Sequence, residues 1–206
     1  MLDKRCRICR RAREKLFLKG ERCLTNKCAF ERRKYPPGQR GKRGTRITDY
    51  LIQLREKQKL KKIYGLRERQ FKNLFELASK MKGSTGDNFI SLLERRLDNV
   101  VYRMGFASSR AQARQLIVHG HILVDGRKVN IPSYLVKQGN KITLKEKTRQ
   151  NYYVLKSISR LENVPVPEWI SLNLENFEGT IVRLPERKDV QLPVSEHLII
   201  EFYSKV

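Results

Sequence analysis

Residues 96–129 read RLDNVVYRMGFASSRAQARQLIVHGHILVDGRKV, and within this stretch the apolar periodicity changes from helical to strand-like. The helical part extends upstream, because apolar residues recur at helical spacing from near Asp87, a candidate N-cap, to Met104. Ser109 followed by Gln112 is a capping-box pattern and predicts a second helix that ends near residue 119. Two consecutive helices are therefore expected before the pattern changes.

The residues that follow predict short strands. Residues 122–124 are apolar, and Asp125-Gly126 is the dipeptide that favours a two-residue hairpin turn. Residues 142–144 supply a third apolar segment after a Gly-Asn turn. Two helices followed by a small sheet predict an α+β module in this part of the chain.

The flanking regions are predicted to be helical before the module and strand-like after it. Thr48 is placed to cap a helix that ends at Gly65, with Leu51 and Leu54 facing a core and cations covering the remainder. Several short apolar segments follow residue 168, of which residues 196–203 are the longest, and these are expected to be strands. The fold class expected for the whole chain is α+β, mainly helical in its N-terminal part.

The charge of the chain indicates a polyanionic partner. The 206 residues carry a net charge of +24, and a surplus of this size is normally neutralised by nucleic acid or, less often, by an anionic membrane surface. Residues 162–206 carry eight acidic and four basic side chains. This acidic end is a better candidate for a protein contact than for nucleic acid. No apolar run is long enough for a transmembrane helix, and the first residues do not form a signal peptide.

All four cysteines lie near the N-terminus, as the pairs Cys6/Cys9 and Cys23/Cys28. Paired spacing of this kind lets four thiolates surround one ion tetrahedrally, and zinc is the default for a structural site. An iron–sulfur cluster is the alternative, and four free thiols are a third reading. A catalytic metal is disfavoured, because no ligand position is left for water. Paired thiolates without an export signal also suggest a reducing, cytosolic compartment.

Basic residues gather in three places that are predicted to contact nucleic acid: an extended Pro/Gly-rich arm after residue 31, the helix that Thr48 caps with its flanks, and the helix and hairpin of the module. A solvated linker and a solvated helix face are the plain alternatives. The predicted contacts are Arg32, Arg33, Lys34, Tyr35, Gln39, Arg40, Lys42, Arg43, Arg46, Arg55, Lys57, Lys59, Lys61, Lys62, Arg67, Arg69, Ser109, Arg110, Gln112, Arg114, His119, His121, Arg127 and Lys128.

The sequence carries no recognisable enzyme motif: it has no P-loop, no nucleophile elbow, no zinc-protease motif and no dinucleotide fingerprint. His119 and His121 form a poor metal or base site, because no carboxylate or cysteine partner completes it, and phosphate contact or surface exposure is expected instead. Asp98 is the module's nearest candidate catalytic carboxylate, but an ion pair with Arg95 or Arg96 explains it better. An RNA-modifying enzyme and a DNA-binding regulator remain as alternatives to a structural RNA binder, and no small-molecule substrate is expected.

Many blocks of the chain resemble one family, that of ribosomal protein four of the bacterial small subunit. The blocks are residues 19–23 (KGERC), 35–39 (YPPGQ), 49–50 (DY), 54–59 (LREKQK), 63–65 (IYG), 68–71 (ERQF), 96–106 (RLDNVVYRMGF), 114–116 (RQL), 119–121 (HGH), 184–187 (LPER) and 196–203 (EHLIIEFY). The resemblance covers essentially the whole chain.

The resemblance implies both a fold and a role. A small RNA-binding module, residues 88–159, would be inserted into a discontinuous domain of residues 1–87 and 160–206, which binds zinc in the members with cysteines. It implies a cytoplasmic structural constituent of the small ribosomal subunit that binds 16S rRNA early, nucleates 5′-domain assembly and contributes to translational accuracy. It also implies contact with ribosomal protein five and with mRNA, where it enters the subunit, through Arg40, Arg43 and Arg46.

Overall fold

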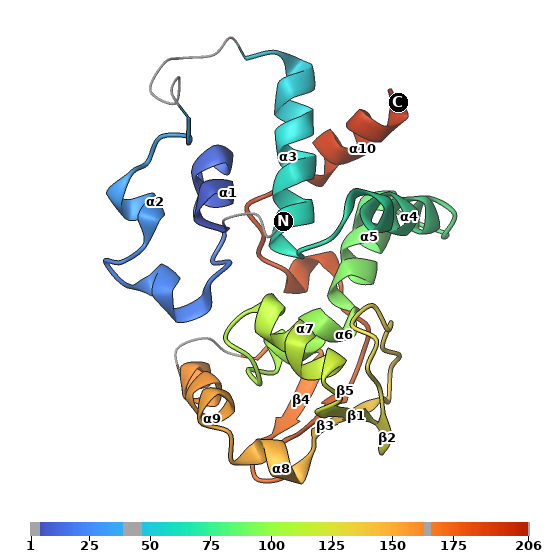
Figure 1. The fold of residues 1–206 in the computed structure, drawn as a ribbon. Coiled ribbons are helices and arrows are strands. Elements are labelled where there is room, and N and C mark those ends of the chain that lie inside the picture. The colour runs from blue at the N-terminus through green and yellow to red at the C-terminus, as the bar shows by residue number, and fades with distance from the viewer. Residues whose placement is uncertain (1–4, 39–46, 163–165, 206) are drawn as a thin grey trace. The chain divides into compact units, whose positions relative to one another are not determined.

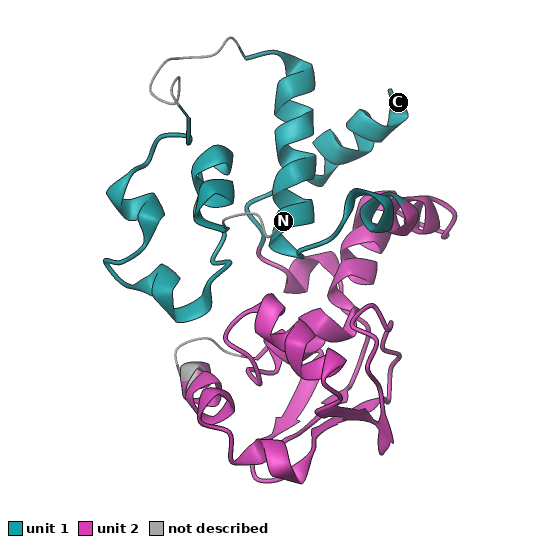
Figure 2. Ribbon diagram, in the orientation of Figure 1, with its two compact units in different colours: residues 1–72, 192–206 teal, residues 73–191 magenta. Residues whose placement is uncertain are grey.

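The computed structural model describes residues 5–38, 47–162 and 166–205. The chain divides into two compact units: unit 1 comprises residues 1–72 and 192–206, and unit 2 comprises residues 73–191 (Figure 2). Both ends of the chain therefore belong to unit 1, and unit 2 is an insertion between them.

Unit 1 is built from helices (Figure 1). They are α1 (Arg5–Ala12), the 3-10 helix η1 (Gly20–Leu24), α2 (Ala29–Arg32), α3 (Asp49–Ile63), the first part of α4 (Glu68–Ser79) and α10 (Glu196–Ser204). Helix α3 begins as predicted, because the Thr48 hydroxyl accepts a hydrogen bond from the N–H of Leu51 at 3.3 Å. It ends at Ile63, and Gly65 (φ +64°) follows at the C′ position, after which the N–H of Leu66 donates to the carbonyl of Lys61 at 3.0 Å. This is a Schellman motif, and it confirms the predicted helix end.

The prediction of a strand at residues 196–203 is wrong, since these residues form helix α10. Ile199 and Phe202 are both buried and lie three residues apart, which places them on one helix face. They pack in unit 1, where α10 contacts α3 and where Leu60 of α3 is fully buried. A short apolar run does not by itself distinguish a strand from a buried helix.

Unit 2 combines helices with one antiparallel sheet of strand order β2-β1-β3-β5-β4. Besides the end of α4, its helices are α5 (Thr85–Glu94), α6 (Leu97–Arg103), α7 (Arg110–Val118), α8 (Glu146–Arg149) and α9 (Tyr152–Ile158), with the 3-10 helices η2 (Ser159–Glu162) and η3 (Arg187–Asp189). Its strands are β1 (Ile122–Val124), β2 (Arg127–Lys128), β3 (Lys141–Leu144), β4 (Ile170–Asn173) and β5 (Glu178–Ile181). The predicted hairpin is confirmed, with Asp125 and Gly126 both at positive φ (49° and 76°), as a primed turn requires.

The helix expected from Asp87 to Met104 is in fact two helices, α5 and α6. Ser84, rather than Asp87, caps α5 by accepting the N–H of Asp87 at 3.4 Å. The break lies at Arg96, whose extended backbone forms a bridge with Leu135. Continuous apolar spacing concealed this break, because the following loop supplies hydrogen bonds that replace those of the helix.

The two C-terminal strands belong to the sheet of unit 2, which moves the predicted boundaries. Strand β5 pairs with β3, with Ile142 opposite Gly179, and β4 pairs with β5. The inserted unit therefore runs from residue 73 to 191 instead of from 88 to 159. Gly179 also approaches the core closely: a Cβ built there would lie 2.5 Å from Cε of Met104.

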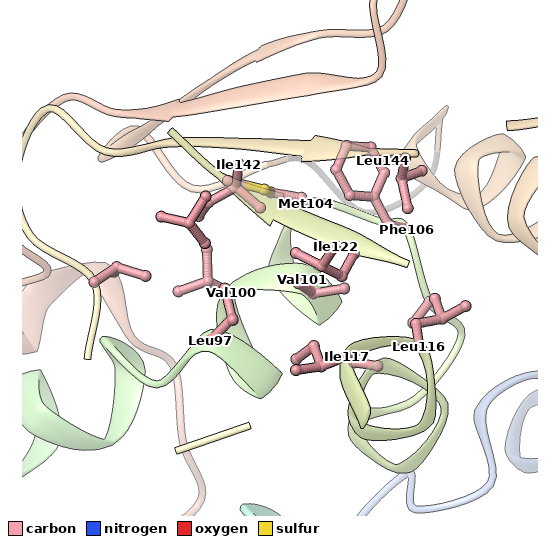
Figure 3. Close-up of a cluster of buried hydrophobic side chains, with 14 of the residues drawn as sticks. Leu97, Val100, Val101, Met104, Phe106, Leu116, Ile117, Ile122, Ile142 and Leu144 are labelled. Atoms are coloured by element: carbon pink, nitrogen blue, oxygen red, sulfur yellow. The ribbon is translucent and has the colours of Figure 1, made fainter. Parts of the chain in front are cut away.

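The core of unit 2 lies between its sheet and helices α6 and α7. Figure 3 shows side chains of α6 and α7, among them Val100, Val101 and Ile117, turned toward those of Ile122 and Ile142 on the strands. All five are fully buried. This layer positions α7 and the hairpin, which carry the predicted contacts of the module.

The helices of the described residues are too short or too polar to cross a membrane. The longest of them, α3, has 15 residues and carries several lysines. In the parts of the chain that the structure describes, no helix has the length and apolar character of a membrane span.

Candidate nucleic-acid interface

A buried carboxylate, that of Asp98 on α6, binds two arginines. It accepts hydrogen bonds from Arg96 at 3.2 and 3.0 Å and from Arg114 on α7 at 2.5 and 3.2 Å. The side chain of Asp98 is 2% exposed, whereas that of Arg114 is 35% exposed. The single negative charge of Asp98 is shared by two guanidinium groups, so the cluster of Asp98, Arg96 and Arg114 carries a net positive charge, and Arg114 presents it at the surface. The predicted ion pair with Arg96 is confirmed; Arg95 donates instead to the carbonyl of Val136 at 3.1 Å.

A second buried carboxylate, that of Glu94, holds the neighbouring side chains. It accepts hydrogen bonds from Arg103 at 2.8 and 3.0 Å and from the amide of Asn99 at 2.7 Å. The side-chain oxygen of Asn99 in turn accepts a hydrogen bond from Nε of Arg110 at 2.8 Å. The guanidinium group of Arg110 also lies 4.7 Å from the ring centroid of Tyr102. Sequence reasoning missed Glu94 and Asn99, because the break between α5 and α6 creates their contact and leaves no periodic signal.

The N-terminus of α7 is capped by Ser109. The Ser109 hydroxyl accepts the N–H of Gln112 at 3.4 Å, as the capping box predicts. The side chain of Gln112 does not return to Ser109; its oxygen accepts the N–H and hydroxyl of Ser108 at 2.8 and 2.6 Å. Arg110 is the first residue of this helix, so a cation stands where the helix dipole already favours an anion.

The hairpin lies against the end of α7. The side chain of Lys128 packs directly on Gly120, because a Cβ atom built at Gly120 would lie 2.1 Å from Cε of Lys128. Arg127, Lys128 and His119 are exposed. His121 is half-buried, and its Nδ1 lies 2.9 Å from the hydroxyl of Thr148. The structure thus brings Lys128 of the hairpin close to the C-terminal end of α7.

Three lysines predicted to face RNA are ion-paired inside unit 1, which corrects the predicted orientation of α3. Lys57 and Lys61 both bind Glu68, the former at 2.6 Å. Burial tends to raise the pKa of Glu68, but the two ammonium groups outweigh it and hold this pKa below its usual value. Lys59 bonds Glu14 at 2.9 Å and Glu56 at 2.8 Å. The buried face of α3 is therefore not that of Leu51 and Leu54, both of which are half-buried; it includes Gln53, Lys57, Leu60 and Lys61.

The other predicted contacts of unit 1 remain at its surface where they are described. Arg67 and Arg69 are exposed, and Arg55 and Lys62 are half-buried. In the basic arm, the exposed residues are Arg32, Arg33 and Lys34. Tyr35 is half-buried, with the guanidinium of Arg10 at 5.1 Å from its ring centroid. The remaining predicted contacts of the arm lie outside the described residues: Gln39, Arg40, Lys42, Arg43 and Arg46.

The four cysteines converge within unit 1. Cys6, Cys9, Cys23 and Cys28 all line one small cavity, and none forms a disulfide. The N–H of Lys19 donates to Sγ of Cys23 at 3.4 Å, a bond that also suits a thiolate bound to metal. In the described residues, however, no group of three or more His, Cys, Asp or Glu side chains has the arrangement of a metal-ligand set. The convergence of the four thiols on one cavity fits a four-thiolate metal site, but in the described residues the sulfur atoms are not arranged as a set of metal ligands.

A basic unit in which helices α6 and α7 pack on an antiparallel sheet, with arginines anchored on buried carboxylates, defines a nucleic-acid-binding module. Comparison with known proteins agrees with this class. Residues 1–94 match the family described as the ribosomal protein S4/S9 N-terminal domain, and residues 95–142 match the S4 domain.

Full-length relatives specify the family. The chain is 57% identical to small ribosomal subunit protein uS4 of Halothermothrix orenii and 58% identical to that of Thermodesulfovibrio yellowstonii, in each case over 97% of this chain and 96% of the relative. It is 57% identical to uS4 of Thermus thermophilus over the same shares. The chain belongs to the uS4 family of ribosomal proteins.

Proposed function

We propose that this protein is a structural, non-catalytic constituent of the small ribosomal subunit, in the cytoplasm, and that it binds 16S rRNA directly. The observation that carries the proposal is the full-length similarity to uS4 proteins, at 57–58% identity over 97% of the chain. The net charge of +24 supports it, because a polyanion must neutralise a surplus of this size. Early binding would nucleate assembly of the 5′ domain.

Binding to a 5′-domain fragment of 16S rRNA tests the proposal. The expected result is tight binding, with an association constant whose logarithm falls linearly with the logarithm of the salt concentration, because each neutralised phosphate releases counterions. A duplex of the same length serves as the control. Equal affinity for the fragment and the duplex would overturn the proposal.

A catalytic role in RNA modification is the weaker alternative. Its best candidate within the module, Asp98, is 1% exposed and bonds Arg96 and Arg114. A carboxylate held in this way has no access to a nucleotide. Incubation with 16S rRNA is expected to produce no modified nucleoside.

Zinc at the four cysteines is the cofactor we propose. The convergence of all four thiols on one cavity supports it, and four soft sulfur ligands suit zinc in a structural site. When bound, the ion would cross-link residues 6–28 and supply no reaction. Metal analysis and the absorption spectrum of the purified protein test the assignment, because an iron–sulfur cluster absorbs visible light and zinc does not.

Two further contacts are proposed from the family resemblance. Arg40, Arg43 and Arg46 would meet mRNA where it enters the subunit, and replacing all three by alanine should slow translation of structured mRNA by reconstituted subunits. The acidic residues 162–206 would contact ribosomal protein five, which their net charge of −4 supports. Pull-down of protein five by the full chain, with salt varied, tests this second contact.

A further inference from the structure

Helices α7 and α9 of unit 2 form a cavity of about 380 Å³, which is separate from the ion pairs described above. Leu116 and Val154 give it an apolar base, and both are buried. Its volume lies within the ~300–1,000 Å³ typical of small-ligand sites. Both helices belong to unit 2, which Figure 2 shows in magenta.

The polar lining of the cavity consists of amide, imidazole and phenol side chains. Gln112 and Asn151 use their side-chain oxygens locally, on Ser108 and on the N–H of Tyr153. Their amide N–H groups therefore remain as donors for a ligand. His121 uses Nδ1 on Thr148, which leaves Nε2 for a partner. Of the described residues that line the cavity, none is acidic.

An exposed aromatic ring stands at the cavity. Tyr152 and Tyr153 are adjacent, their side chains are 66% and 68% exposed, and their ring centroids are 5.6 Å apart. Only Tyr153 of the two lines the cavity, whereas Tyr152 has the ammonium group of Lys156 at 5.8 Å from its ring. Exposed aromatic rings beside amide donors are what proteins use to hold unstacked RNA bases.

We propose that this cavity holds one unstacked base of the bound RNA, with the base on the Tyr153 ring and its edge hydrogen-bonded by amide and imidazole groups. The proposal rests on the rRNA binding proposed above and names the part of the RNA that this site recognises. A phosphate fits less well, because no Lys or Arg is among the described residues that line the cavity. A metal fits less well too, because His119 and His121 have no third ligand among the described residues.

The two tyrosines provide a matched test in the full-length protein. Tyr153→Ala should weaken binding to the 5′-domain fragment on the order of 10-fold, as loss of base stacking does, and Tyr152→Ala should change it little. The slope of the logarithm of the association constant against the logarithm of salt concentration should be unchanged in both variants, because neither substitution removes a phosphate contact. Equal effects of the two variants would overturn the proposal, and so would a changed slope for Tyr153→Ala alone.

A second pair of variants fills the cavity without removing a ring. Gln115 lines it and is exposed, so Gln115→Trp should block the base and weaken binding similarly, whereas Val118→Trp, at an exposed position on the same helix outside the cavity, should not. The fragment transcribed with 4-thiouridine should cross-link to the peptide that contains Tyr153, and Gln115→Trp should abolish this product. Persistence of the cross-link in that variant would overturn the proposal.

These outcomes separate the two proposals. If the unaltered protein binds the fragment no better than it binds a duplex, the proposed function fails. If the unaltered protein binds tightly and Tyr153→Ala binds equally tightly, only the base site fails. Thermal unfolding of each variant shows whether unit 2 remains folded.

Discussion

The carboxylate of Asp98 lies 2.5 Å from the guanidinium of Arg114, and this ion pair joins a residue buried in unit 2 to one that reaches its surface. The arginine is therefore oriented before any ligand arrives. An oriented side chain loses less conformational entropy on binding, which favours affinity. Arg110 is held in the same way by Asn99, so the surface of α7 presents arginines in a fixed arrangement.

Removal of the Asp98 carboxylate should strongly destabilise unit 2. Asp98→Ala leaves Arg96, which is 3% exposed, buried without its counter-charge. Breaking a buried ion pair in this way costs about 3–5 kcal/mol. Denaturant unfolding measures the loss, and Asp87→Ala, at an exposed carboxylate on α5, is the control that should change stability by less than about 0.5 kcal/mol. A similar loss in both variants would contradict the assigned role.

Lys59 should contribute to the stability of unit 1 and not to RNA binding. Its ammonium group bonds Glu14, Glu56 and the carbonyl of Pro193, so Lys59→Met should lower the free energy of unfolding by about 2 kcal/mol. The slope of rRNA affinity against salt should stay unchanged. Arg69→Met, at an exposed position, should show the reverse pattern. A shallower salt slope for Lys59→Met would show that this lysine does contact phosphate.

The stability of unit 2 should depend on pH through Asp189. Two hydrogen bonds from Arg183, at 2.6 Å each, hold the pKa of Asp189 below its usual value, although burial opposes the shift. A lowered folded-state pKa adds stability above the unfolded value of about 3.9, and this contribution is lost as the pH falls through the folded value.

The stability difference between the unaltered protein and Asp189→Asn should therefore be constant from pH 5 to 7 and shrink below about pH 4. Unfolding measured across this range tests the prediction. Lys188→Met, which removes an exposed ion pair with Glu186, should leave the profile nearly unchanged. A difference that grew on acidification would refute the assignment.

Loss of one cysteine should loosen unit 1 alone. Cys9 is buried and lines the shared cavity, so Cys9→Ser should release the metal, expose the first 30 residues to proteases and weaken rRNA binding there. Unit 2 should remain protease-resistant, because it has a core of its own. Limited proteolysis with metal analysis tests this prediction. Unchanged rRNA binding by the metal-free variant would remove the proposed role of the site.

Local signals predicted the elements that depend on local chemistry. Thr48 and Ser109 cap helices through their own hydroxyl groups, and Asp125-Gly126 adopts a turn that few other residue pairs can adopt. Each of these features is decided within a few residues, and each was predicted correctly. The break at Arg96 was not predicted, because the partner of its backbone, Leu135, lies 39 residues further along the chain.

The pairing of the charged side chains was predicted less well than the elements. Composition shows that lysines are abundant on α3, but it does not show that Glu68 and Glu14 lie within reach of their ammonium groups. Likewise, the spacing of the cysteines predicted their convergence, whereas Glu94 gave no signal of its contact with Asn99. A charge is exposed or paired according to what the fold places beside it.

The amino-acid sequence by itself determined the family, the polyanionic partner, the caps at Thr48 and Ser109 and the turn at Asp125-Gly126, because each follows from composition or from neighbours along the chain. The tertiary structure decided the rest: the pairing of β5 with β3 that sets the extent of unit 2, the helical state of residues 196–203, and which cations are oriented by buried carboxylates. The physical reason is common to all three. They depend on contacts between residues far apart in the sequence, whose burial outweighs local preference.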